Sequence, residues 1–218
     1  MEKREKNNLI TELLEGAKSI AILPNKVSGV DAYCAGVGLY QMLKAKEKKV
    51  ALIYPGKIPD KCEDLLNKDE IVSDLNSREL HVSIDYSNTP AAKVQYNTEH
   101  GVLYLKISPV HKEFDPGRVR TELRGQDYDV IITIGAQVLE DFGQTYRELE
   151  SVIHAGKIIN LDNTDRNFRF GHFNLVEPFA DSLSLLLLTS AVDWDLNVTK
   201  EAAAALLVGI SHRNPNVG

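Results

Sequence analysis

The sequence predicts a single α/β domain, residues 1–218, with a doubly wound, mostly parallel β-sheet flanked by helices and an inserted β-hairpin. Three observations predict this class. Short apolar runs alternate with amphipathic segments along the chain. A strand–loop–helix–strand unit of about 35 residues, which is typical of parallel pairing, spans Ser19–Tyr54. Two alternating runs flank the turn-rich segment Asn97–Gly101, which favours a hairpin.

The first third of the chain contains the clearest unit. Leucines and isoleucines at helical spacing predict an amphipathic helix over Lys3–Ala17. A short apolar strand, Ser19–Leu23, leads into the loop Pro24–Val30 and a helix over Asp31–Ala45. The second strand, Lys49–Tyr54, ends at a Pro-Gly turn.

The rest of the chain repeats the alternation of apolar runs and polar loops. The expected strands are Leu80–Ile84, the hairpin pair Lys93–Tyr96 and Val102–Ile107, Asp129–Ile134 and Gly156–Leu161. A weak helix follows the loop Gly135–Gln137, and an apolar helix is expected over Phe179–Ala191. Ala202–Ile210 fits either a helix or the approach to a last strand. The polar end, Ser211–Gly218, fits either a fragment of a longer protein or a frayed natural terminus.

Composition excludes several classes of function. The net charge of −6 disfavours binding to duplex nucleic acid, which needs a broad basic face. A small basic pocket for a short nucleotide is compatible with this charge. The two cysteines, Cys34 and Cys62, give neither a disulfide framework nor zinc-ligand spacing. No signal peptide is visible at Met1–Asn8, and the apolar run Leu185–Leu188 is too short for a membrane span. We therefore expect a cytoplasmic protein without membrane contact.

Ligands of parallel α/β sheets bind beyond the carboxyl ends of the strands. In this chain those ends are expected at Asn25–Asp31, Asp85–Asn88, Gly135–Val138, Asp162–Arg169 and Ser211–Asn214. A shared site is therefore expected among these loops.

Three motifs in these regions carry a family resemblance. The most specific is Ile158–Pro178 (IINLDNTDRNFRFGHFNLVEP), and the others are Ile20–Val50 and Asp129–Gly143 (DVIITIGAQVLEDFG). In order and spacing the chain resembles the DHH phosphoesterase superfamily, most closely its RecJ-like and nanoRNase-like members. The resemblance covers nearly the whole chain from Ser19. It implies a paired divalent metal site, usually manganese, that clamps a phosphate and lowers the pKa of a bridging water.

Most of the metal ligands that the resemblance implies are replaced in this sequence. The His, Asp and Asp of the family's first loop fall at Asn25, Gly29 and Asp31, of which only Asp31 is kept. The Asp after the third strand falls at Gly135, which has no side chain that ligates a metal. The Asp of the last motif falls at Arg213, a fixed cation.

The Asp-His-His triplet that gives the family its name falls at Asp162, Asn163 and Thr164. Only Asp162 survives, and amide oxygens are weak, neutral ligands beside the carboxylates and imidazoles that manganese prefers. The sequence therefore predicts the loss of the paired metal site. No cofactor is predicted, except Mn²⁺ or Mg²⁺ under the alternative given below.

Cationic and amide side chains around the two retained acids suggest a different role. They either form a phosphate cradle in place of the metals or close the old site with structural salt bridges. We assign Asp31 and Asp162 as the retained catalytic positions. The candidate ligand-binding residues are Asn25, Lys26, Asn163, Thr164, Arg166, His212 and Arg213.

Structural alternatives stay open for several of these residues. Asp162 fits a turn cap, Asp31 fits an N-cap of the helix that it precedes, and Cys34 fits apolar packing. His212 is expected in a strand-end loop. The basic residues Arg118, Arg120 and Arg124 fit either a solvated face or a contact with a phosphate or an acidic partner.

These features predict a domain with a degenerate metal site that binds a phosphate-containing small molecule, a short nucleotide or a protein partner without catalysis. The alternative is a phosphoesterase that hydrolyses short oligonucleotides or (cyclic) dinucleotides with an atypical metal site. A third hypothesis makes the hairpin Lys93–Ile107 a subunit interface. The family's C-terminal substrate-binding domain has no counterpart in these 218 residues, and the oligomeric state is left open.

Overall fold

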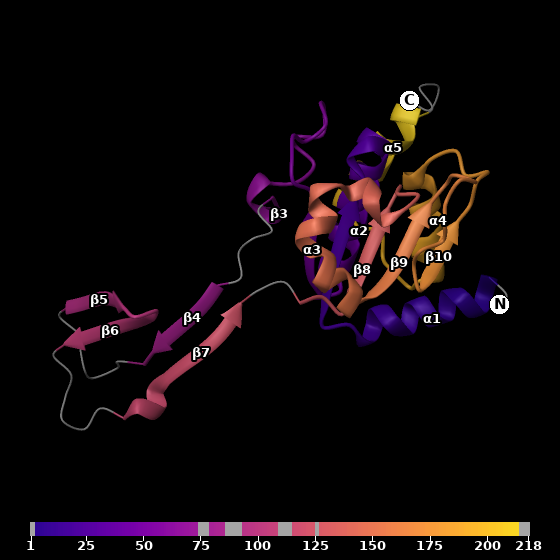
Figure 1. Ribbon diagram of the computed structural model, residues 1–218. Coiled ribbons are helices and arrows are strands. Elements are labelled where there is room, and N and C mark those ends of the chain that lie inside the picture. Colours follow the sequence, from indigo (N-terminus) through magenta and orange to yellow (C-terminus); the bar gives the residue numbers. More distant parts are fainter. Residues whose placement is uncertain (1–2, 74–78, 86–92, 109–114, 125–126, 214–218) are drawn as a thin grey trace. The chain divides into compact units, whose positions relative to one another are not determined.

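The computed structural model describes residues 3–73, 79–85, 93–108, 115–124 and 127–213 (Figure 1). They form two compact units. The core unit comprises Met1–Asn76 and Gln126–Gly218, and the inserted unit comprises Ser77–Gly125.

The core unit is built on a six-stranded sheet in which every strand runs parallel to its neighbours, in the order β10-β9-β8-β1-β2-β3. This arrangement confirms the predicted α/β class. The strands are β1 (Ser19–Pro24), β2 (Lys49–Ile53), β3 (Ile71–Val72), β8 (Val130–Ile134), β9 (Lys157–Asp162) and β10 (Phe173–Val176).

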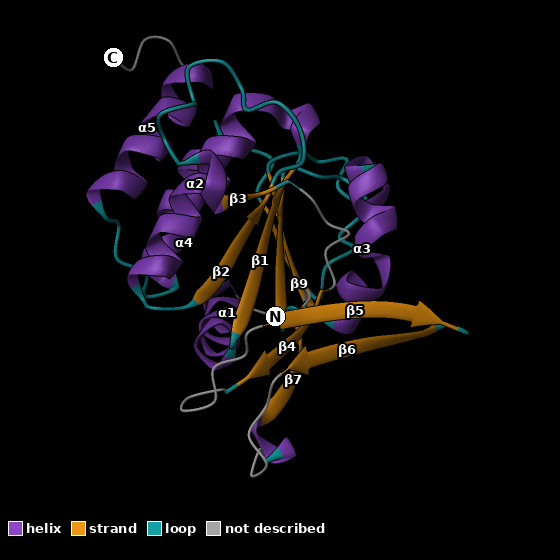
Figure 2. Cartoon of the chain, turned by 90° about the vertical axis from the view of Figure 1, so that its left-hand side faces the viewer, coloured by secondary structure: helices purple, strands orange, loops and turns teal. Residues whose placement is uncertain are grey.

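Helices cover both faces of this sheet (Figure 2). One face carries α1 (Lys3–Gly16), α2 (Gly29–Ala45), α4 (Leu183–Asp193) and α5 (Lys200–Arg213), and the opposite face carries α3 (Gln144–Ala155). Short 3₁₀ turns lie at Lys26–Ser28 (η1), Lys68–Glu70 (η2) and Leu139–Phe142 (η4). The two faces explain why β1 and β8 are continuous apolar runs, since strands buried on both sides need apolar residues throughout.

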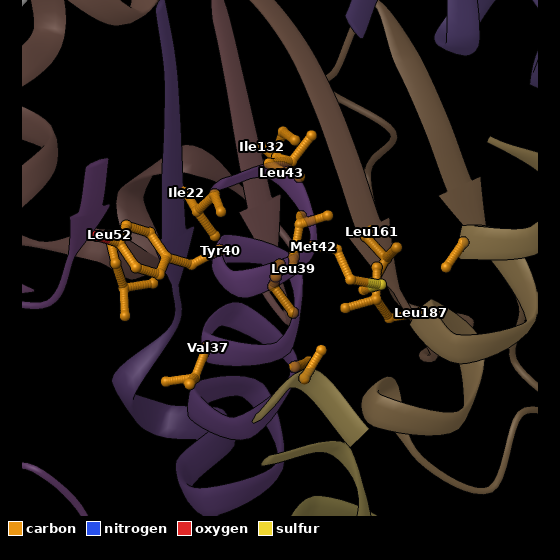
Figure 3. Close-up of a cluster of buried hydrophobic side chains, with 14 of the residues drawn as sticks. Ile22, Val37, Leu39, Tyr40, Met42, Leu43, Leu52, Ile132, Leu161 and Leu187 are labelled. Atoms are coloured by element: carbon orange, nitrogen blue, oxygen red, sulfur yellow. The ribbon is translucent and has the colours of Figure 1, made fainter. Parts of the chain in front are cut away.

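Helix α2 lies at the centre of the larger core, between the sheet and α5. Figure 3 shows its side chains, among them Leu39 and Met42, packed against Ile22 and Ile132 of the sheet. A methyl group at Gly38 would lie 2.7 Å from a side-chain carbon of Leu206. The absence of a side chain there lets α2 and α5 approach closely. Because α2 is enclosed by the sheet on one side and by α5 on the other, it is apolar on nearly all sides.

Three segments of the core unit differ from the sequence-based expectation. The short strands β3 and β10 were not predicted, because two and four residues give too few alternations to detect. The segment expected to lead into a strand-end loop at Ser211–Asn214 is helical through Arg213, as the last turn of α5. Its alanine-rich sequence favours helix, and the helix continues into the polar residues.

The inserted unit consists of two antiparallel ribbons. Strands β4 (Glu79–Ile84) and β7 (Val119–Arg124) form one, after the 3₁₀ turn η3 (Pro116–Arg118). Strands β5 (Lys93–Glu99) and β6 (Val102–Ser108) form the other, which confirms the predicted hairpin. Its two-residue connection, His100-Gly101, has positive φ angles of 50° and 79°, as tight hairpin turns require.

Strand β7 was not predicted from the sequence, and Arg120 and Arg124 lie on it. Among the described helices of both units, none is long and apolar enough to cross a membrane.

Candidate functional site

The carboxyl ends of β1, β8 and β9 lie side by side at one edge of the sheet. The register pairs Pro24 with Ile134 and Ile134 with Leu161, so the loops that follow start next to one another. These loops carry Asn25, Gly135 and Asp162. Three of the five expected strand-end loops therefore meet at this edge. Asp85 instead follows β4 of the inserted unit, and Ser211–Arg213 lie in α5.

Asp31, in the first turn of α2, is hydrogen-bonded to the start of α4. Its carboxylate is buried and accepts hydrogen bonds from the backbone nitrogens of Leu183 (2.7 Å) and Ser184 (2.9 Å). The Ser184 hydroxyl donates to the backbone oxygen of Asp31 at 3.2 Å. Negative charge at a helix N-terminus is favourable, because the first backbone N–H groups lack partners within the helix. Asp31 therefore caps α4 rather than its own helix.

Within the described residues, Arg213 is the one predicted cation within 4 Å of Asp31 or Asp162. Its Nε atom lies 3.9 Å from Oδ2 of Asp31, and its side chain is 57% exposed. That position corrects the prediction of a strand-end loop for His212 and Arg213, because both lie in the last turn of α5. The Arg213 guanidinium places positive charge where the resemblance implies a metal-binding acid.

Asn25 and Gly135 close the space between the β1 and β8 loops. The Asn25 amide donates to the backbone oxygen of Gly135 at 2.9 Å, and its Oδ1 accepts from the nitrogen of Val27 at 3.1 Å. The Ser28 hydroxyl donates to the same Gly135 oxygen at 2.6 Å. Gly135 has a φ of +74°, and a Cβ there would lie 2.8 Å from both Ser28 Oγ and Leu183 Cδ1. An acid at this position has no room.

Asp162, at the end of β9, is buried and held from two sides. Its Oδ1 accepts from the backbone nitrogen of Asn163 (2.9 Å), and its Oδ2 accepts from the amide of Asn167 (2.9 Å). Burial raises the pKa of the Asp162 carboxyl, and the nearby charge of Asp141 raises it further, whereas the bonds from Asn167 and Asn163 lower it. The hydrogen bonds therefore offset only part of the desolvation.

A chain of buried amides continues from Asp162 into the sheet. Asn167 also donates to the backbone oxygen of Ala136 (2.7 Å) and accepts from Asn160 (2.8 Å). Asn160 in turn donates to Asn174 (3.2 Å) and accepts from the Thr133 hydroxyl (3.3 Å). Sequence reasoning missed this network. The available signal was an asparagine inside the apolar run of β9, where a buried amide needs partners.

The remaining candidates lie on the same edge but do not surround the acids. The Asn163 amide donates to the backbone oxygen of Ala180 at 3.0 Å, and Thr164 Oγ1 accepts from the Arg166 nitrogen at 3.3 Å. Lys26 and Arg166 are exposed. In the described part of the chain, neither forms an ion pair with Asp31 or Asp162.

A hollow of about 530 Å³ lies between the start of α2, the loop after β2 and the last turns of α5. Its walls carry both charged and apolar side chains. They are Val30, Asp60, Lys61, Leu207, Val208, Ser211 and His212. Lys61 was not among the residues predicted from the sequence, because the loop after β2 does not belong to the motifs that carry the resemblance.

The residues at this edge do not fit a paired metal site. Across the described residues, no group of three or more His, Cys, Asp or Glu side chains is placed to hold a metal ion. The oxygens of Asp31 and Asp162 already accept hydrogen bonds from protein N–H groups. A metal bound there would have to share oxygens that already accept these bonds, and at Asp31 it would lie near the Arg213 guanidinium.

Together these features define an α/β domain with its candidate site at the carboxyl edge of the sheet. The carboxylates of Asp31 and Asp162 at this edge accept hydrogen bonds from the protein itself. Among solved structures, the chain is similar to an exopolyphosphatase-related protein from Bacteroides fragilis, with a TM-score of 0.64 and 18% sequence identity. The match covers 99% of this chain and 52% of that one, so this chain spans about half its length. The likeness shows that this chain shares the fold of that protein. No family model and no curated protein matches the chain.

Proposed function

We propose that this chain is a degenerate DHH phosphoesterase-like domain that binds a phosphate-containing small molecule or short nucleotide without hydrolysing it. Two lines support the family assignment. The three motifs follow the family's order, and the core has the fold of an exopolyphosphatase-related protein. Fold alone does not define activity, which depends on the side chains of the site.

The non-catalytic assignment is supported by the hydrogen bonds that Asp31 and Asp162 accept from the protein itself. Asp31 holds the N-terminus of α4, and Asp162 holds the loop that follows β9. Metal-assisted hydrolysis needs carboxylates free to coordinate cations and to activate a water. At Gly135 a new acid would collide with Ser28, so a single substitution does not restore the ligand set.

Basic side chains around the hollow favour a phosphate ligand. Lys61 and His212 line its walls, and Arg213 follows His212 in the same helical turn. The one acid of the hollow, Asp60, is paired with Lys57 at 2.7 Å, which offsets its charge. Guanidinium and ammonium groups bind phosphate through charge-assisted hydrogen bonds, and Arg213 is exposed enough to turn toward a ligand.

The test is titration of the full chain with inorganic phosphate and with the dinucleotide pApA, followed by calorimetry and amide NMR shifts. We expect both probes to bind. Arg213→Ala and His212→Ala each weaken binding by about tenfold, which corresponds to about 1.4 kcal/mol. The matched control is Arg147→Ala, an exposed arginine of α3 on the opposite face of the sheet, and it leaves binding unchanged.

Turnover assays on pApA and a cyclic dinucleotide, with Mn²⁺ or Mg²⁺, complete the test. We expect a flat progress curve. Manganese-dependent hydrolysis that disappears in folded Asp162→Asn would overturn the proposal and establish the alternative, a phosphoesterase with an atypical metal site. Failure of both probes to bind would also overturn it and leave a role through a protein partner.

A further inference from the structure

One face of the β5–β6 ribbon in the inserted unit is apolar except for Thr98. Direct cross-strand partners share a face, so the register groups Val94 with Ile107, Tyr96 with Leu105, and Thr98 with Leu103. The apolar side chains of this face are largely exposed. Their exposed fractions are 65% for Val94, 78% for Tyr96, 59% for Leu103 and 50% for Leu105.

The other face is mixed. It carries Lys93, Gln95, Asn97 and Glu99 of β5 opposite Ser108, Lys106, Tyr104 and Val102 of β6. The alternation within β5 is typical of a strand with one covered face. A two-stranded ribbon alone is marginally stable in water, and three or more strands with an apolar face are normally needed. The pattern therefore calls for further strands beside this ribbon.

Strand β5 also has an open edge. In the described residues its only strand partner is β6, so the backbone groups along its other edge have no strand to pair with. Unpaired edges of this kind are templates for strand addition. We propose that β5 pairs antiparallel with β5 of a second copy of this chain, centred on Tyr96, to form a four-stranded sheet.

The sequence of β5 selects this register. Centring on Tyr96 places Lys93 opposite Glu99 of the second copy, and the symmetry repeats this pair at the other end of the strand. The Glu99 side chain is 64% exposed, with His100 Nε2 3.8 Å from its carboxylate. A shift of two residues either way loses both Lys–Glu pairs.

The uncharged residues fit the same register. Val94 lies opposite Thr98 and Gln95 opposite Asn97, while the two Tyr96 rings meet on the apolar face at the centre of the sheet. That face contains no charged residue, so two copies bring no like charges together there. The charges and side chains of β5 therefore favour a second copy of this chain as the partner of its open edge.

The test is the molar mass of the full chain by sedimentation across a concentration series. We expect a dimer. Lys93→Glu and Glu99→Lys each place like charges at both ends of the paired strands and raise the dimer Kd by about tenfold or more. The double swap, Lys93→Glu with Glu99→Lys, restores the wild-type Kd. An equimolar mixture of the two single variants forms a heterodimer, because each supplies the charge that the other lacks.

The matched control is Lys106→Glu, which reverses an exposed charge on β6 and leaves the dimer intact. A wild-type chain that stays monomeric at every concentration would overturn the proposal. A dimer insensitive to both single swaps, or one lost equally in the control, would also overturn it. Loss of phosphate binding at the sheet edge has no bearing on this result, so the proposed function and the interface fail separately.

Discussion

The carboxylate of Asp31 lies 2.7 Å from the backbone nitrogen of Leu183, across 152 residues of sequence. This bond joins the first turn of α2 to the first turn of α4, and the Ser184 nitrogen adds a second bond to the same carboxylate. An acid that the family resemblance assigns to metal chemistry is thus a structural group in this chain. Stability measurements test that role directly.

Asp31→Ala should lower the free energy of unfolding by roughly 2–4 kcal/mol, because two buried N–H groups lose a charged acceptor. Urea unfolding measures this change. Asp165→Ala, in the exposed loop after β9, is the control and should shift stability by less than about 0.5 kcal/mol. An Asp31→Ala protein of unchanged stability that loses a bound manganese ion would contradict the structural role.

Gly135→Ala should destabilise the chain by about 2 kcal/mol or more, from left-handed strain together with crowding against Ser28. Gly143 offers a matched control, since its φ is +56° and nothing lies within 4 Å of the Cβ position. Gly143→Ala should therefore report the strain alone. Equal losses in the two variants would show that the space beside Gly135 is open.

The pH dependence of stability should carry opposite contributions from two aspartates. Burial raises the folded-state pKa of Asp162, so the folded state binds more protons between the ordinary carboxyl pKa and the folded pKa. Stability from this group is greatest below that window and falls as the pH rises through it. Asp162→Asn should remove this fall, as urea unfolding between pH 3 and pH 7 measures.

Asp129 provides the contrast for that experiment. Backbone N–H groups of Ser19 and Lys18 lower the pKa of its carboxyl, so its contribution is present above the ordinary pKa and is lost on acidification. Asp129→Asn should therefore flatten the acid side of the profile, by a small amount because the site is exposed. Slopes of the same sign for both variants would refute the assignment.

The two thiols should be inert in the folded protein. Cys34 and Cys62 are fully buried with their sulfur atoms 3.8 Å apart, and burial raises the pKa of both. Thiolate is the reactive form, so reaction with a colorimetric disulfide reagent at neutral pH should proceed only through unfolding. Cys62→Ala should leave Cys34 equally slow. Rapid labelling of either thiol in the native chain would contradict this.

The main elements of the fold could be predicted because they are long and periodic. The runs Ile20–Leu23 and Val130–Ile134 are buried on both sides, and polar and apolar residues alternate along Lys93–Glu99 except at Thr98. Strands β3, β7 and β10 escaped prediction because they are short or rich in polar residues. The end of α5 was misplaced because its last polar turn is helical only as a continuation of the preceding one.

The candidate site was predictable in position but not in geometry. The carboxyl edge follows from strand order, and the retained acids follow from the motifs. The partners of Asp31 lie more than 150 residues away, and the amide chain through Asn160 and Asn167 depends on which loops meet. Such contacts arise from tertiary packing and leave no local pattern.

The inserted unit is one continuous stretch, Ser77–Gly125, between β3 and β8, whereas the parallel sheet draws all its strands from the flanking residues. Under the two proposals, separate segments of the chain therefore determine subunit association and anion recognition. Replacing Ser77–Gly125 would change the number of associated copies and would leave the sequence of the anion-binding loops unchanged. Relatives that share this core are then free to differ in stoichiometry.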